Sequence, residues 1–125
     1  MRSRYPYDTS CEPPAPVVPV RISVPGSRDR GVALAALIDS GADVTVIPTA
    51  VAGAMGLPPI GALKVSGVAG IVRRAIVYAA EVEINGLRRT VEVVGLGQEA
   101  LLGRNFINQC VLTLDGPELQ AEVTA

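Results

Sequence analysis

The stretch Leu37-Ile38-Asp39-Ser40-Gly41-Ala42-Asp43 places a carboxylate at the end of a continuous apolar run, Val32 to Ile38. Such a run is typical of a strand that is buried on both faces. Burying an acid beside it is costly unless the acid is hydrogen-bonded or functional. Gly41 has no Cβ to block close backbone approach, and its N–H can donate to the Asp39 carboxylate. The spacing therefore predicts a rigid loop that carries an acid at its tip.

Short strands are predicted on both sides of this loop. Apolar residues alternate from Val17 to Val24, and residues 25–31 are predicted to form a turn. Asn85-Gly86 is a strong two-residue hairpin signal between two further strands. Pro48 is expected in the first turn of a helix over Thr49–Met55 that ends at Gly56. The other predicted strands are Val44–Ile47, Val77–Ile84, Leu87–Val94, Ala100–Leu102, Val111–Leu114 and Leu119–Val123, and Arg104–Gln109 is predicted to form one or two helical turns.

These patterns predict an all-β sandwich or barrel with one or two short helices. The length of 125 residues favours one domain, over residues 17–125. Residues 1–16 form a Pro-rich N-terminal arm, expected to be extended and either disordered or packed on a partner. The arm has no apolar region typical of a secretory signal, so a cytoplasmic location is expected.

Composition excludes several classes of function. The chain has no histidine, which removes Ser-His-Asp and Cys-His nucleophile systems and His-ligated metal sites. The net charge is −1, from 11 basic and 12 acidic residues, so no nucleic-acid or membrane partner is expected. Neither a metal nor a cofactor is expected. Cys11 and Cys110 could form one disulfide, but two free thiols are favoured.

The acid-tipped loop resembles the active-site loop of retropepsin-like aspartic proteases of the single-domain bacterial or cellular type. Their motif runs apolar-apolar-D-[ST]-G-A-D-x-[ST]-apolar-apolar, and residues 37–47 match it at every position. A second motif of the family, apolar-apolar-Gly-Arg-Asn, is matched by Leu101-Leu102-Gly103-Arg104-Asn105. Between the two lies the Gly-rich stretch Lys64–Ile71, where the family carries its flap. The resemblance implies a closed barrel that is one half of an acid protease.

The activity that the resemblance implies is that of an aspartic endopeptidase acting on polypeptides. Two aspartates would share one proton and activate a water molecule between them. The chain has one D-[ST]-G, because Asp115-Gly116 lacks the hydroxyl residue. The resemblance therefore implies a homodimer in which each copy contributes Asp39. The alternative is a retropepsin-like dimer that binds peptides but cleaves them weakly or not at all.

Supporting roles also follow from the resemblance. Ser40 would bridge the two loops of the dimer, unless it is an ordinary turn serine. Arg104 would pair with Asp43 behind the loop, unless that contact is only a solvated surface ion pair. Asp39 is the expected catalytic residue. Gly41 and Ala42 are the other residues expected to support its loop.

The Gly-rich hairpin tip is expected to act as a flap that closes over an extended peptide. A plain surface hairpin is the alternative interpretation. The flap residues expected to contact substrate are Ser66, Gly67, Val68, Ala69 and Gly70. Side chains expected either to line substrate pockets or to lie in the core are Ala42, Val44, Val68, Ile71 and Leu102.

Residues 95–100 also match the dinucleotide-binding fingerprint G-x-G-x-x-A, and Asp115 lies twenty residues after Gly95. Gly103 would then lie inside the required helix, and the rest of the chain predicts β-hairpins. The dinucleotide interpretation is therefore disfavoured. The Pro-rich arm suggests one further hypothesis, namely that the protease trims its own N-terminus.

Overall fold

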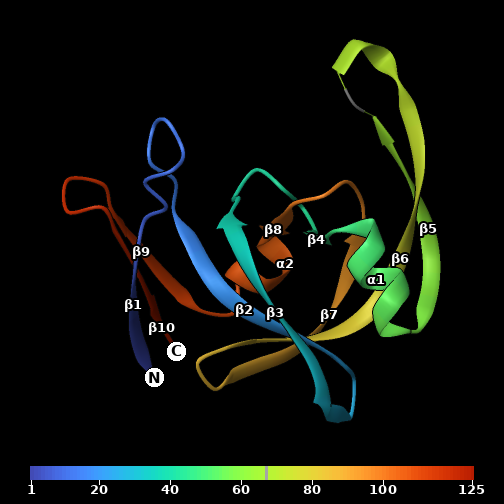
Figure 1. Cartoon of the computed structure of the whole chain (residues 1–125), viewed down its shortest axis with the longest axis horizontal. Helices are drawn as coiled ribbons and strands as arrows, with labels where there is room; N and C mark the ends of the chain where they lie inside the picture. The colour runs from blue at the N-terminus through green and yellow to red at the C-terminus, as the bar shows by residue number, and fades with distance from the viewer. Residues whose placement is uncertain (67) are drawn as a thin grey trace.

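The computed structural model describes residues 1–66 and 68–125, with the backbone alone at positions 28, 29 and 68. Within these residues the protein is nearly all β, with two short helices (Figure 1). No helix in this part of the chain is long and apolar enough to cross a membrane. The strands are β1 (Arg2–Pro6), β2 (Val17–Val24), β3 (Ser27–Ile38), β4 (Thr45–Ile47), β5 (Pro59–Ser66), β6 (Val72–Ile84), β7 (Leu87–Gly95), β8 (Ala100–Leu102), β9 (Val111–Asp115) and β10 (Gln120–Thr124), and the helices are α1 (Thr49–Met55), α2 (Arg104–Ile107) and a 3₁₀ turn (Val68–Gly70).

Six strands form a closed barrel in the order β2-β3-β8-β4-β7-β6, because β2 also pairs with β6. The β3–β8 and β4–β7 pairs are parallel, whereas β2–β3 and β6–β7 are antiparallel. Strand β5 lies outside the ring and pairs along β6 as a hairpin. The predicted all-β barrel with two short helices is confirmed.

Local signals in the sequence position most of the strands. Val18, Val20 and Ile22 of β2 are buried in the core, as their alternation predicts. Asn85 and Gly86 both have positive φ, +43° and +90°, and connect β6 to β7 in a two-residue turn. Gly56 ends α1 in the left-handed region, as predicted, whereas Pro48 lies one position before the helix rather than inside its first turn.

Two expectations for β3 are wrong. The turn after β2 is only Pro25-Gly26, so β3 begins at Ser27 and residues 27–31 belong to the strand. The run Val32–Ile38 is also not buried on both faces. Ala36 is buried, but Ala33 and Ala35 are exposed. The reason is closure of the barrel, which turns one face of each strand outward.

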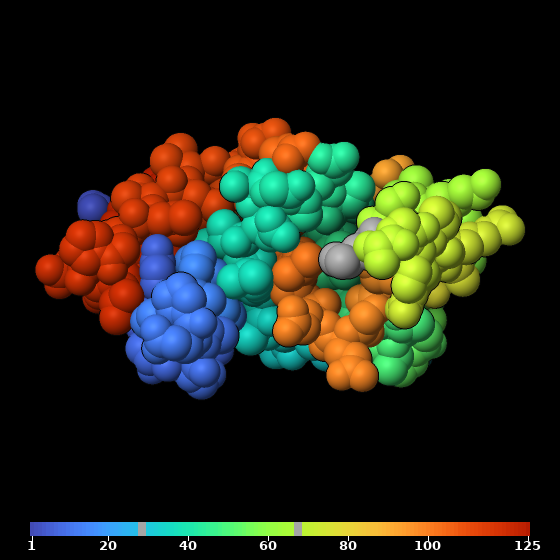
Figure 2. Space-filling model, turned by 90° about the horizontal axis from the view of Figure 1, so that it is seen from above, coloured from blue at the N-terminus to red at the C-terminus, as the bar shows by residue number. Residues whose placement is uncertain are grey.

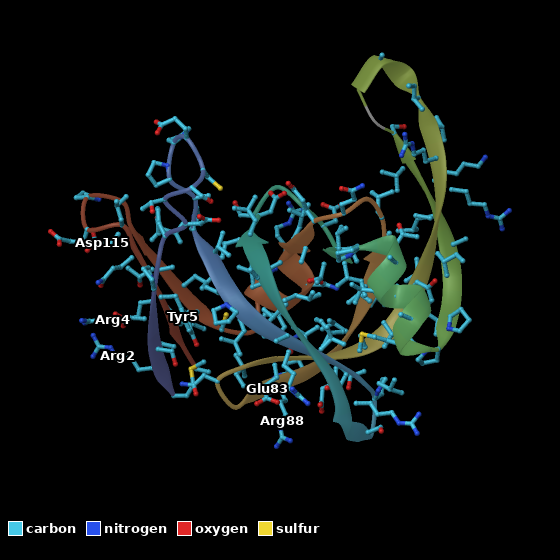
Figure 3. The ribbon with its side chains drawn as sticks, viewed as in Figure 1. Arg2, Arg4, Tyr5, Glu83, Arg88 and Asp115 are labelled. Carbon is cyan, nitrogen blue, oxygen red and sulfur yellow. The ribbon has the colours of Figure 1, made fainter. Side chains whose placement is uncertain are left out.

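The chain ends meet in a second sheet, of order β1-β10-β9. Arg2–Pro6 pairs antiparallel along Gln120–Thr124, so the first part of the N-terminal arm is ordered against its own chain. Arg2 and Arg4 project from the same side of β1, and each donates through Nε to the carboxylate of Glu122, at 2.7 and 3.1 Å (Figure 3). The unpaired edge of the β9–β10 hairpin accepts this strand, which explains why the segment is neither disordered nor free.

Protonation of Glu122 should loosen this contact. The hydrogen bonds from Arg2 and Arg4 hold the pKa of Glu122 below its usual value. A lowered pKa stabilises the folded state above the pKa of the unfolded chain, and that stabilisation is lost as the pH falls through the lower folded value. We expect the protection factors of the β1 amides, each taken relative to the free-chain exchange rate at the same pH, to fall below about pH 4. Glu122→Gln should show lowered protection factors in β1 already at neutral pH, whereas Glu118→Gln should match the wild type.

Candidate active site

Asp39, in the loop after β3, is held by two backbone–backbone hydrogen bonds and by one from a backbone N–H to its side chain. Its N–H donates to the Leu102 carbonyl at 3.0 Å, and its own carbonyl accepts from the Ala42 N–H at 3.1 Å. The Gly41 N–H donates to Asp39 Oδ1 at 3.0 Å, as the sequence predicts. Asp39 is half-buried, so the carboxylate is fixed in direction and still reaches solvent.

Helix α2 supports the loop from behind. The Arg104 N–H donates to the Ala42 carbonyl at 2.9 Å. Its guanidinium donates through Nη1 to the Ser40 carbonyl at 2.8 Å and through Nη2 to Asp43. The expected contact with Asp43 is therefore present, but the guanidinium spans two acceptors instead of binding one carboxylate with both nitrogens. The two side chains are 45% and 82% exposed, so the ion pair itself contributes little stability and mainly sets geometry.

A buried network joins β4 to α2, and the sequence analysis gave no role to its members. Asn105 Oδ1 accepts from the Thr45 N–H at 3.0 Å and from Thr45 Oγ1 at 2.9 Å. Thr45 Oγ1 in turn accepts from the Gly103 N–H at 3.1 Å, and Asn105 Nδ2 donates to the Glu92 carbonyl at 2.7 Å. The Ser/Thr position of the first motif and the Asn of the second are the sequence signal that could have identified this network.

Thr45→Val should destabilise the protein by about 1–3 kcal/mol, because it leaves the Gly103 N–H buried without its acceptor. Valine keeps the shape of the side chain, so the loss reports the hydroxyl and not a cavity. Denaturant unfolding measures the difference, and Thr90→Val on the exposed face of β7 is the matched control. Equal stability of the two variants would show that the hydroxyl network does not stabilise the fold.

The flap segment forms the end of the β5–β6 hairpin, which extends away from the barrel (Figure 1). Ser66 pairs with Val72, and the 3₁₀ turn that begins at Val68 contains Ala69 at φ +66° and Gly70 at φ +73°. Ser66, Ala69 and Gly70 are exposed. Gly67 and the side chain of Val68 lie outside the described residues.

The candidate pocket residues have different surroundings. Leu102 is fully buried in the main core, so it is not a pocket wall. Val44 packs against a smaller cluster of Ala75, Val77 and Val94, and Ala42 is half-buried. Ile71 is exposed on the hairpin.

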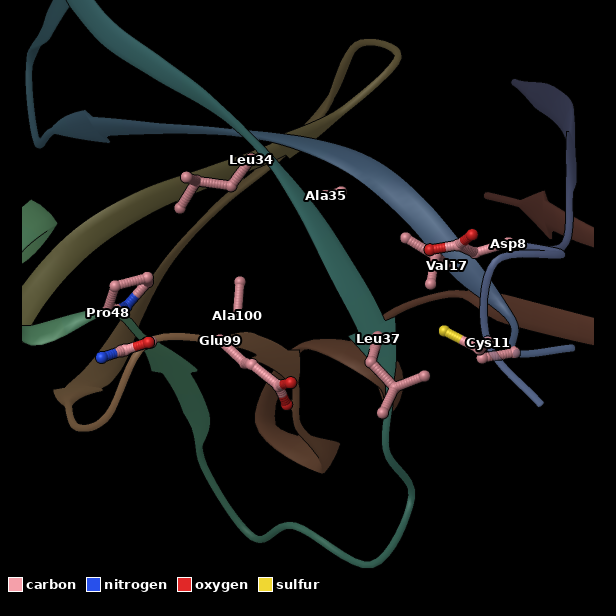
Figure 4. A pocket seen from close by; sticks show the side chains of 11 residues that line it. Asp8, Cys11, Val17, Leu34, Ala35, Leu37, Pro48, Glu99 and Ala100 are labelled. Atoms are coloured by element: carbon pink, nitrogen blue, oxygen red, sulfur yellow. The ribbon is translucent and has the colours of Figure 1, made fainter. Parts of the chain in front are cut away.

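A cavity of about 320 Å³ lies beside the loop (Figure 4). Leu37, two residues before Asp39, lines it together with Ala100 of the neighbouring strand β8. Asp8 and Cys11 of the N-terminal segment also line the cavity. This cavity has no signal in the local sequence pattern, because it depends on a long-range contact between residues 8–17 and β3.

Solved structures share this fold. The chain has a TM-score of 0.62 to a retropepsin-like aspartic protease from Rickettsia conorii, at 15% identity over 98% of this chain and 91% of that one. The EIAV protease, solved with an inhibitor, gives 0.60 at 20% identity over 76% and 86% of the two chains. The simian foamy virus protease gives 0.51 at 23% identity over 72% and 91%. Among curated proteins, none matches the chain in sequence.

A sequence model of the family described as "gag-polyprotein putative aspartyl protease" matches residues 29–109. The match covers more than half of the chain and includes both the Asp39 loop and α2. This match confirms the family that the two motifs indicate, and the barrel of the solved proteases agrees with it. The chain belongs to the gag-polyprotein aspartyl protease family and has the retropepsin-like fold.

Proposed function

We propose that the protein is an aspartic endopeptidase that acts as a homodimer, with one Asp39 from each copy. The observation that carries the proposal is the state of Asp39, an acid fixed by the Gly41 N–H at the end of a strand and still open to solvent. The sequence contains one such D-[ST]-G loop. A second carboxylate must therefore come from another chain.

The chemistry needs one ionised and one protonated carboxyl group, because two carboxylates this close cannot both ionise. The ionised Asp39 takes a proton from water as the water oxygen bonds to the scissile carbonyl carbon. The protonated Asp39 of the other copy donates to the carbonyl oxygen. The resulting diol collapses when the first Asp39 gives its proton to the amide nitrogen, the Asp39 of the other copy takes a proton back from a diol hydroxyl, and the C–N bond breaks. A carboxylic acid and an amine are released, and each carboxyl group is back in its starting protonation state.

A free strand edge supports the dimer. Among the described residues, β9 pairs only with β10, and its other edge is open. Its side chains Val111 and Leu114 are 62% and 51% exposed. Strand β9 follows α2, which holds the Asp39 loop, and the red C-terminal residues and the turquoise residues near position 40 lie along one side of the molecule (Figure 2). A second copy that pairs there would bring its loop to the same region.

Mixing wild-type chains with Asp39→Asn chains tests the shared site. If one site needs Asp39 from two copies, casein hydrolysis falls with the square of the wild-type fraction, to about one hundredth when one chain in ten is wild type. Sites confined to single chains would leave about one tenth. The mixture is equilibrated at a concentration where sedimentation shows dimers. A linear response contradicts the homodimeric site, and a wild-type protein that binds peptides without cleaving them contradicts the endopeptidase.

A further inference from the structure

The cavity beside Asp39 combines apolar walls with acidic ends. Its apolar surface comes from β2, β3 and β8 and from the residue before α1, and the side chains involved are Val17, Leu34, Ala35, Leu37, Pro48 and Ala100. Its volume of about 320 Å³ is at the lower end for ligand pockets, which suits a single long side chain. Leu37 and Asp39 are about 7 Å apart along the chain direction, so the cavity adjoins the proposed reaction centre.

Two carboxylates lie at this cavity, and none of the described residues that line it is basic. Asp8 accepts hydrogen bonds from the Ser10 N–H at 2.9 Å and from Ser10 Oγ at 2.6 Å. The hydroxyl bond and then the backbone bond lower the pKa of Asp8, so this group is ionised at neutral pH. Glu99 is exposed at the residue before β8.

Cys11 lies within reach of the charges of both carboxylates. Its sulfur points toward Leu37, and Glu99 lies between Leu37 and Pro48 (Figure 4). Burial is the main reason why the pKa of the Cys11 thiol is raised, and the negative charges of Asp8 and Glu99 raise this pKa further. The thiol is therefore neutral, so it adds no charge to the two carboxylates at the cavity.

We infer that this cavity is a substrate subsite for the side chain of arginine or lysine, with Glu99 and Asp8 as the groups that recognise its charge. The inference rests on the proposed function and adds the class of substrate side chain. A basic residue has an aliphatic stem that the apolar walls can cover and a cationic head that can reach the carboxylates. Arginine fits best, because its planar fork can donate two hydrogen bonds to one carboxylate. Acidic side chains would be repelled.

A cleavage profile on a proteome-derived peptide library tests the inference for the active protein. We expect arginine and lysine to be enriched at one fixed position near the scissile bond. On the best arginine peptide, Glu99→Gln should lower kcat/KM about tenfold, and on the same peptide with citrulline it should change kcat/KM less than about twofold. Glu118→Gln, in an exposed turn, should leave both values unchanged. The inference would be overturned by a cleavage profile with no preference for arginine or lysine, or by equal losses of kcat/KM on the arginine and citrulline peptides. Either result would leave the proposed endopeptidase activity intact.

Binding to the Asp39→Asn protein separates the subsite from catalysis. Acetyl-arginine methylamide and acetyl-citrulline methylamide are titrated while NMR follows the amides of Cys11, Leu37 and Ala100. We expect the arginine compound to shift these amides with at least about threefold higher affinity than citrulline, and Glu99→Gln to remove the difference. This result would support the subsite even if the wild type cleaves nothing. No shift at these amides, or equal affinities, would overturn it.

Discussion

Asp39→Asn should abolish peptide-bond hydrolysis and leave the fold intact. The asparagine Oδ1 can still accept the Gly41 N–H, and the backbone bonds to Leu102 and Ala42 do not involve the side chain. In the proposed mechanism, the change removes the group that takes the proton from water. We expect casein cleavage to fall by about a thousandfold or more, measured by mass spectrometry at several pH values. The Tm and the circular dichroism spectrum should match those of the wild type.

Asp115→Asn is the matched control for this change, because Asp115 is the other aspartate followed by glycine. It lies at the end of β9, where its side chain accepts from the Glu118 N–H, and it should retain activity. Fragments in equal yield from wild-type and Asp39→Asn protein would show that cleavage comes from a contaminant or another mechanism.

Gly103→Ala should be the most destabilising single methyl addition among the described glycines. A Cβ there would lie 2.4 Å from the Val44 carbonyl carbon, 2.5 Å from the Val44 oxygen and 2.7 Å from the Thr45 nitrogen. These are backbone atoms of the segment that enters β4, which the Thr45–Asn105 bonds hold in place. We expect a loss of about 3 kcal/mol in the free energy of unfolding, and loss of activity because the Asp39 loop must shift.

Gly53→Ala tests whether this cost is specific to the site. Gly53 lies in α1, and nothing is within 4 Å of its added Cβ. Alanine there should stabilise the protein by about 0.5–1 kcal/mol, because glycine is a poor helix former. Urea unfolding of both variants measures the contrast. Similar free energies of unfolding for Gly103→Ala and Gly53→Ala would show that the Val44 backbone can shift at little cost.

Local patterns predict much of this fold because they depend on neighbouring residues only. The alternation in β2 and the Asn85-Gly86 turn are fixed by strand pleat and by positive φ. The Asp39 loop is also a local structure, since Gly41 reaches back only two residues. The Arg104 contact is long-range, and it was predictable only through the family motif.

Features that depend on distant partners were not predictable from local pattern. The outward face of β3 is as apolar as a buried one, and only closure of the ring by the β2–β6 pairing leaves it uncovered. The pairing of Arg2–Pro6 with β10 joins the two ends of the chain. The acidic cavity arises for the same reason, since Asp8 and Glu99 lie far apart in the sequence.

The meeting of the chain ends has a consequence for biosynthesis. Strand β1 is synthesised well before its partner β10, which lies 114 to 122 residues further along the chain. Strand β1 therefore stays unpaired until β10 has been made. Pairings of such sequence separation form slowly, so the terminal sheet should be the last part of the molecule to assemble. Because β9 belongs to that sheet, newly made chains would associate through β9 only after the sheet has formed.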